Sequence, residues 1–192
     1  MTRGFRRRLW RRRLRGMTIW QVMLGVVLSG IAALTAVDLY QSGQEANNRN
    51  ESVLLLQRLR VGIERTYSGD PSYGTADTNL VPVLAARGLI PDSALVTTTS
   101  GSTTTTTIRH PFGGAVTVLG HVDSEPTHFK VTFEDIETEV CAALADGYVG
   151  RTRARSGIVK IDFDGTEEDA PVTRAEVTTN CADDMDLGFV FG

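Results

Sequence analysis

Three histidines are the first residues of this chain that could bind a metal. His110, His121 and His128 fall within 19 residues of one another in a sequence of 192, and converging imidazoles can hold a transition metal. No fixed spacing brings them together, so we expect solvated loop histidines. The sequence also lacks G-x-S-x-G, a phosphate-binding glycine loop and H-E-x-x-H. We therefore predict neither an enzyme nor a bound cofactor.

Two acidic clusters carry the oxygen ligands that calcium prefers. Their members are Asp162, Asp164 and residues 167–169 in the first, and Asp183, Asp184 and Asp186 in the second. Neither cluster has the spacing of a calcium-binding loop, in which a glycine follows three alternating ligands. We therefore expect no metal site in either cluster.

The chain has two cysteines, Cys141 and Cys181. We expect a disulfide between them, because the segment that carries them is predicted to enter an oxidising compartment. Closing this loop would remove unfolded-state entropy equivalent to about 4 kcal/mol. Two free buried thiols are the alternative. A zinc site is not expected, because no histidine lies at a matching short spacing.

An uncharged run over residues 17–37 indicates export. As a helix, its 21 residues would be about 30 Å long, the thickness of the apolar core of a bilayer. Eight arginines lie within residues 1–16, and the next basic residue is Arg49. This asymmetry predicts an N-terminus on the cytoplasmic side of a membrane, with the rest of the chain on the other side.

The exported part is acidic. Residues 17–192 carry 12 basic and 23 acidic side chains, a net charge of −11. Nucleic acid is therefore not an expected partner, because phosphate binding needs a basic face. The arginines of residues 1–16 are explained as a topology signal instead.

Several interpretations of residues 1–37 are open. A cleaved signal peptide requires a shorter apolar run and a small-x-small site before Asp38, which the sequence does not clearly contain. A twin-arginine export signal is suggested only by the arginine pairs. An uncleaved signal anchor fits both the length of the run and the charges.

The junction between RRRLRG and MTIWQV resembles that of the type IV prepilins, whose basic leader ends in glycine. The resemblance implies that a prepilin peptidase cuts between Gly16 and Met17, on the cytoplasmic side of the apolar run. Glycine suits this position, because a residue without Cβ lets a protease approach the backbone closely. The predicted organisation is a leader over residues 1–16, a long helix over 17–69 and a head over 70–192. Residues 17–37 of that helix would first span the membrane and later form the filament core.

Position 21 departs from the pilin pattern. Type IV pilins usually have glutamate as the fifth mature residue, where it would pair with the α-amino group of a neighbouring subunit, whereas this chain has Gln21. A neutral amide avoids a charge in lipid but cannot neutralise an ammonium group. The resemblance implies an assembly role for Gln21. It leaves open another assembly device, a minor or divergent subunit, and a merely polar residue at a helix interface.

The remaining sequence predicts an α+β fold with a long N-terminal helix against an antiparallel sheet. No proline interrupts a helix between residues 17 and 70. An apolar stripe at helical spacing follows in its second half and comprises Val53, Leu56, Leu59, Ile63 and Tyr67. This stripe should be the spine of the core.

Turn residues separate the other predicted elements. These are a short helix in 80–91, a threonine-rich hairpin or edge strand in 96–108, strands at 115–119 and 128–133, a helix at 136–145 capped by Asp135, a strand at 158–163, an acidic loop at 164–169, a helix from a Thr173–Glu176 capping box to Cys181, and a last strand at 187–191. The disulfide would then join two helices. For the threonine tract we predict solvated strands, with O-glycosylation as the alternative role.

These segments extend the resemblance to the type IVb pilins. HPFGGAVTV contains the Pro-Phe-Gly-Gly turn that often precedes a strand in that subclass, and LGFVF matches its C-terminal strand. TEVCAALADG and PVTRAEVTTNC place one cysteine in each of two helical segments. The likeness covers most of residues 13–192 and is loose over 73–109. It implies a non-enzymatic, homo-oligomeric extracellular filament for adhesion or conjugation, built from a membrane-anchored precursor by inner-membrane pilus machinery.

Two other classes of protein remain open. A bitopic inner-membrane protein with an exported ligand-binding domain would keep its leader. A minor pilin, or a pseudopilin of a secretion system, would share both the leader and the fold.

Overall fold

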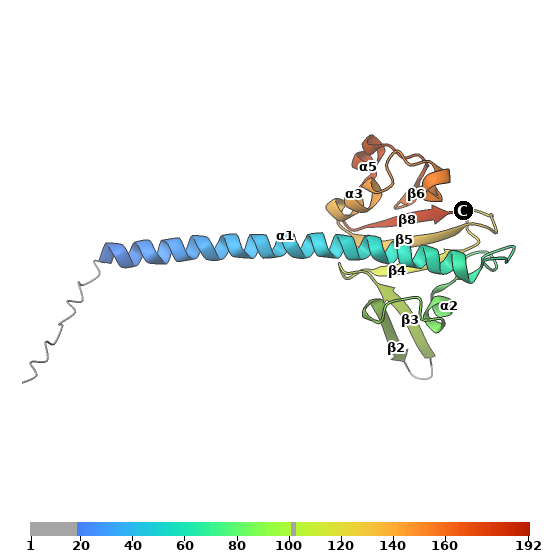
Figure 1. The fold of residues 1–192 in the computed structure, drawn as a ribbon, viewed down its shortest axis with the longest axis horizontal. Coiled ribbons are helices and arrows are strands. Elements are labelled where there is room, and N and C mark those ends of the chain that lie inside the picture. The colour runs from blue at the N-terminus through green and yellow to red at the C-terminus, as the bar shows by residue number, and fades with distance from the viewer. Residues whose placement is uncertain (1–18, 101–102) are drawn as a thin grey trace, which may run out of the picture. The chain divides into compact units, whose positions relative to one another are not determined.

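The computed structural model describes residues 19–100 and 103–192 (Figure 1). The chain divides into two compact units, Met1–Gln44 and Glu45–Gly192. The second, which we call the C-terminal unit, holds every strand and every buried core residue of the described chain.

The longest element is helix α1, Ile19–Thr66. Its last turns belong to the C-terminal unit, where Leu56, Leu59 and Ile63 are at most 1% exposed. This burial confirms the predicted apolar stripe. The structure adds Leu55, which is 4% exposed, because the buried face of a helix packed on a sheet is wider than a single stripe.

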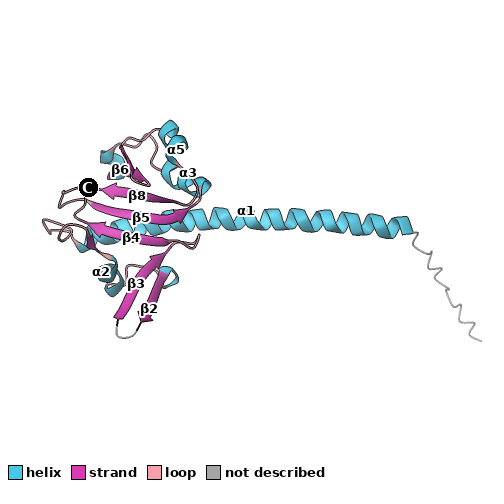
Figure 2. Ribbon diagram, turned by 180° about the vertical axis from the view of Figure 1, so that it is seen from behind, coloured by secondary structure: helices cyan, strands magenta, loops and turns pink. Residues whose placement is uncertain are grey.

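An antiparallel sheet of eight strands forms the other layer of the C-terminal unit (Figure 2). The strand order is β2-β3-β4-β5-β8-β6-β7, and β1 pairs with β4. The bounds are β1 Thr78–Asn79, β2 Leu95–Ser100, β3 Thr103–Arg109, β4 Ala115–Gly120, β5 Phe129–Ile136, β6 Ile158–Phe163, β7 Thr166–Asp169 and β8 Met185–Phe191. The predicted α+β fold, with a long N-terminal helix and an antiparallel sheet, is confirmed.

The last strand in the sequence, β8, lies in the middle of the sheet. Its Phe189 is opposite Val131 of β5 on one side and Ile161 of β6 on the other. The pattern of residues 187–191 predicts a strand but says nothing of its neighbours.

Short helical segments connect the strands within the described residues. They are α2 Val81–Ala86, the 3-10 turn η1 Asp92–Ala94, α3 Thr138–Asp146, α4 Arg153–Ser156 and α5 Arg174–Asn180. The predicted capping box of α5 is present. The N–H of Thr173 donates to Glu176 Oε2 at 2.7 Å, and the N–H of Glu176 donates to Thr173 Oγ1 at 3.3 Å.

The core joins α1 to the inner face of the sheet. Four phenylalanines from β5 and β8 are at most 1% exposed and share one cluster with Leu59; they are Phe129, Phe133, Phe189 and Phe191. The rings of Phe129 and Phe191 stack with centroids 5.1 Å apart. Burial of such large apolar side chains is the main source of stability for a unit of this size.

The structure corrects the predicted start of the helix that carries Cys141. Asp135 is not its N-cap, because β5 continues through a bulge to Ile136. Asp135 lies within this irregular stretch and has a positive φ of 56°. Helix α3 begins at Thr138, whose N–H donates to Asp183 Oδ1 at 3.0 Å. A carboxylate 45 residues away therefore satisfies the start of the helix, which no local pattern indicates.

The predicted acidic loop at 164–169 is also wrong. Thr166–Asp169 forms β7, and Asp164 and Gly165 make the turn from β6 with φ values of 50° and 88°. Acidic residues disfavour strands. Pairing with β6 overrides that preference, helped by the ion pair between Lys160 Nζ and Glu167 Oε2 at 2.9 Å.

Truncation of Leu59 should destabilise the protein by about 2–5 kcal/mol, because its fully buried side chain would leave a cavity between α1 and the sheet. Leu54 on the same helix is 51% exposed, so Leu54→Ala should cost less than about 0.5 kcal/mol. Chemical unfolding followed by circular dichroism measures both. Equal losses would contradict the assignment of the two helix faces.

Candidate functional site

Four residues share the outward side of α1 in the C-terminal unit, and we call this surface the α1 outer face. They are Leu54, Arg58, Val61 and Arg65. Leu54 is 51% and Val61 59% exposed, although the opposite side of the same turns is closed to solvent. Exposed apolar side chains beside arginines are typical of protein–protein contacts. The sequence pattern does not predict a role for Leu54 or Val61. The only indication in the sequence is that both are apolar residues outside the predicted stripe.

A hollow lies on each side of the α1 outer face. Near α2, a cavity of 400 Å³ lies between Leu54, Val61 and Gly62 of α1 and Leu89. On the other side, a cavity of 390 Å³ lies between α1 and Tyr148. Val61 lines both cavities. The surface is therefore an apolar ridge between two depressions, a shape that the side chains of a partner can fill.

Arg60 links α1 to the sheet and to the segment before it, and so supports the rotation of α1 that its buried apolar side chains set. Its Nε lies 2.8 Å from Glu64 Oε1, one Nη donates to the carbonyl oxygen of Ser156, and its guanidinium carbon lies 5.2 Å from the centre of the Phe191 ring. Gly157 makes room for this arrangement. It has a φ of +67°, and a Cβ there would lie 2.3 Å from an Arg60 nitrogen.

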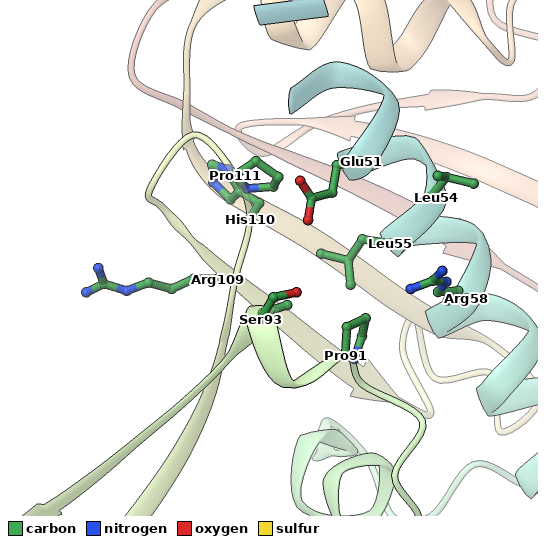
Figure 3. A pocket seen from close by; sticks show the side chains of 10 residues that line it. Glu51, Leu54, Leu55, Arg58, Pro91, Ser93, Arg109, His110 and Pro111 are labelled. Atoms are coloured by element: carbon green, nitrogen blue, oxygen red, sulfur yellow. The ribbon is translucent and has the colours of Figure 1, made fainter. Parts of the chain in front are cut away.

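A smaller cavity of 250 Å³ lies where α1 approaches the turn after β3 (Figure 3). Glu51, Leu55 and Arg58 contribute from α1, and Ser93 contributes from η1. None of the polar side chains that line it has a buried atom without a hydrogen-bond partner. The lining of this cavity therefore gives no indication of a bound ligand.

His110 borders this cavity and holds the Pro-Phe-Gly-Gly turn. Its Nε2 donates to the carbonyl oxygen of Glu134 at 2.8 Å, and its Nδ1 accepts the N–H of Phe112 at 3.3 Å. These partners define a neutral imidazole. Burial lowers the pKa of His110, against the opposing effects of the Glu134 carbonyl and of Asp135. Gly114 lies against the hydrogen bond between His110 and Glu134, since a Cβ at this position would lie 2.0 Å from the carbonyl oxygen of Glu134.

The prediction of solvated histidines is therefore wrong for two of the three. His110 is 3% and His128 9% exposed, whereas His121 is half-buried. Across the described residues, no three or more histidine, cysteine or acidic side chains are grouped so as to hold a metal ion. The turn residues around these histidines indicate loops in the sequence. They do not indicate whether the folded chain buries the histidine side chains.

The acidic clusters serve the architecture. Asp162 forms an ion pair with Lys130 and also accepts the N–H of Gly165 at 2.8 Å. Asp183 caps α3, and Asp186 Oδ1 accepts the N–H of Asp135 at 3.3 Å. Backbone donors and lysine thus satisfy these carboxylates.

The disulfide between Cys141 and Cys181 is present, which confirms the predicted pairing. Its Cα atoms are 5.8 Å apart, within the normal range. It joins α3 to the residue that ends α5. The disulfide therefore links the first and the last helix of the segment that connects β5 to β8.

The residues predicted to act in processing are outside the described part of the chain. Gly16 and Met17 precede it, and Gln21 lies in α1 with a side chain that the structure does not describe. Of the residues that are described, none form a helix long and apolar enough to cross a membrane.

Solved structures define the class of fold. A type IVb pilin from Salmonella typhi superposes with a TM-score of 0.54 and 18% identity, over 73% of this chain and 96% of the pilin. TcpA, a type IV pilin from the Vibrio cholerae El Tor biotype, gives a TM-score of 0.53 and 12% identity, over 76% of this chain and 99% of TcpA. At these identities the likeness shows the fold alone. It is the type IV pilin fold, as the resemblance in the sequence implies.

The family follows from the sequence. The family model described as PilS N terminal matches residues 45–191, which is nearly the whole C-terminal unit. The chain belongs to this family. No curated protein matches it.

Acidification should weaken the fold through His110. Because burial lowers its pKa below the ordinary 6.5, the unfolded chain binds this proton more readily than the folded chain does. The stability that His110 contributes should thus be fully present above pH 6.5 and fall as the pH drops below it. Chemical unfolding at a series of pH values between 6.5 and about 5, above the range of most carboxylates, measures the slope.

His110→Gln should flatten that slope, and His121→Gln is the matched control, which should retain it. Identical slopes in all three proteins would show that the buried imidazole does not couple protonation to folding.

Proposed function

We propose that this protein is a structural subunit of a type IV pilus. The observation that carries the proposal is the α1 outer face, an exposed apolar ridge in a chain with the pilin fold. Leu54 and Val61 are about half exposed, so burying each of them between subunits would contribute roughly half of the 1.5–3 kcal/mol of a fully exposed side chain. A contact between different faces of two copies is heterologous, and repetition of such a contact gives an open helical filament.

Charge supports a second copy as the partner of the α1 outer face. Arg58 and Arg65 flank the apolar residues, and both are exposed. The chain beyond residue 16 has an excess of acidic side chains. A neighbouring copy therefore offers carboxylates to these arginines, which favours specific docking over like-charge contacts.

The proposal includes the N-terminal features predicted from the sequence. A prepilin peptidase would remove residues 1–16 by cutting after Gly16, and residues 17–37 would pass from inner-membrane lipid into the filament core. A helix that is apolar all round can exchange lipid for neighbouring helices with little change in free energy. Gln21 would lie in that core as a neutral amide. The rest of the helix, to residue 69, and the head over 70–192 would be periplasmic in the precursor and extracellular in the pilus.

A minor pilin, or a pseudopilin of a secretion system, is the second candidate. Gln21 in place of glutamate favours it, because a neutral side chain cannot neutralise the α-amino group of a neighbour. Abundance in sheared surface filaments separates the two candidates, since a minor subunit should be scarce there. The role of the filament, in adhesion or conjugation, would then be carried by the surface of the head.

Processing predicts the mass of the mature chain. Co-expression with a prepilin peptidase should yield a protein that begins at Met17, because the peptidase would cut behind the glycine of the leader. Gly16→Trp should remain uncut, since a bulky side chain blocks access to the scissile bond. Mass spectrometry of the N-terminal peptide reads both results. A chain that keeps its arginines would instead indicate a bitopic membrane protein.

Assembly should depend on the α1 outer face. Val61→Glu replaces an apolar contact with a carboxylate that would engage Arg58 and Arg65 on its own helix, and it should lower the yield of sheared filaments at least tenfold, because a charge is costly to desolvate and the arginines are no longer free for the carboxylates of a neighbour. Val83→Glu is the matched control, since Val83 is also exposed, at 36%, but lies on α2. Both variants should keep the wild-type unfolding temperature. Full filament yield from Val61→Glu would exclude the α1 outer face as the contact.

A further inference from the structure

Strands β2 and β3 form a hairpin that extends beyond the rest of the sheet (Figures 1 and 2). They pair with each other at six positions, whereas β3 pairs with β4 only at Ile108 and Arg109. We call β2 and β3 the threonine hairpin. Side chains on both of its faces are exposed, with Thr97 and Thr104 on one face and Thr98 and Thr105 on the other.

β2 is an edge strand without the usual protection. Natural edge strands are short, or carry charged residues or proline, because their unpaired N–H and C=O groups can recruit another strand. The opposite edge follows this rule, since β7 has four residues, of which Glu167, Glu168 and Asp169 are acidic. By contrast, residues 93–108 contain no charged residue and no proline.

The threonine hydroxyls of β2 have few partners within the chain. Among the described side chains of the hairpin, the hydroxyl of Thr107 donates to the carbonyl oxygen of Val96 at 3.3 Å. No hydrogen bond within the described chain engages the hydroxyls of Thr97, Thr98 or Thr99. The edge is therefore open in both its backbone and its side chains.

We infer that β2 is a docking strand for β2 of a second copy of this chain, so that the two sheets join edge to edge in antiparallel orientation. Pairing within the hairpin supports this choice of occupant. β2 already accepts a threonine-rich neighbour in β3, with Thr97 opposite Thr106, Thr98 opposite Thr105 and Thr99 opposite Thr104. A second β2 offers the same β-branched cross-strand pairs.

Charge supports the same occupant. Two copies of an acidic chain repel each other over most of their surfaces. They can approach with least repulsion through a segment that has no charge. A strongly basic or acidic partner would find no complementary side chain on residues 93–108.

This contact goes beyond the proposed function and is independent of the α1 outer face. Pairing of β2 with β2 is isologous, so it relates two copies by a two-fold axis and closes on itself. It cannot extend a filament, but it can join copies that belong to two different filaments. A single pair of six-residue strands is a small interface, and many such pairs along two filaments would act together through multivalency.

The register of the pair gives the test. Variants of the full-length chain with one added cysteine are made at positions 96–99, and pairs of variants are mixed and oxidised with copper phenanthroline. In a two-fold antiparallel pair, the two positions that cross-link best should always have the same sum. If Thr98→Cys cross-links best with itself, for example, Thr97→Cys should cross-link with Thr99→Cys rather than with itself.

Thr178→Cys on the exposed surface of α5 is the matched control and should give little dimer. Non-reducing electrophoresis measures the dimers, and intact mass confirms that Cys141 and Cys181 stay paired. Absence of cross-links, or equal cross-linking at all positions, would overturn the proposal.

A charge on the edge should abolish the contact. Thr98→Lys places a lysine from each copy on the shared edge and should reduce the yield of the best cross-linked pair of cysteine variants about five-fold or more. Thr178→Lys should leave it unchanged. Filament yield should be normal in Thr98→Lys, which separates this proposal from that for the α1 outer face. A sugar mass on residues 97–99 in purified protein would also overturn the proposal, because a glycan would block the edge.

Discussion

The packing of α1 on the sheet is the constraint on which the rest of the structure depends. Leu59 and Ile63 share one buried cluster with the phenylalanines of β5 and β8, so the inward face of the helix is fixed by the largest apolar contact of the C-terminal unit. Arg60 adds contacts from α1 to Ser156 and to the ring of Phe191, which hold the same rotation of the helix. Once that rotation is set, Leu54 and Val61 have no place in the core and must face solvent.

The sheet needs its last strand to be complete. β8 lies between β5 and β6 and contributes Phe189 and Phe191 to the core, so the strands on either side of it cannot pair with each other. Between β5 and β8 the chain makes an excursion through α3, α4, the sheet strands β6 and β7, and α5. The disulfide between Cys141 and Cys181 crosses that excursion, and Asp183 caps α3 from the segment just before β8. The disulfide and this hydrogen bond thus tie α3 to the end of α5 and to the segment before β8.

Several acidic and histidine side chains of the C-terminal unit make structural contacts. Asp162 is neutralised by Lys130, Asp186 binds the backbone of Asp135, and His110 holds its turn through both ring nitrogens. Two exposed surfaces of the C-terminal unit are available for contacts with other copies of the chain. The ridge on α1 suits heterologous contacts that propagate, whereas the uncharged edge of β2 suits a symmetric contact that closes. The two surfaces lie on different elements and need not compete.

The sequence by itself determined the features that depend on near neighbours. These are the long helix and its buried stripe, the capping box of α5, the threonine-rich hairpin and the antiparallel pair of β4 and β5, because periodicity and turn residues act over a few positions. The tertiary structure decided which distant groups meet. Asp183 caps α3 in place of Asp135, β8 enters the middle of the sheet, and His110 and His128 are covered. The same holds for the candidate site, since Leu55 and Leu54 are adjacent apolar residues and only the packing of the sheet buries one and exposes the other. Such outcomes depend on the sum of many contacts across the fold, which no short segment encodes.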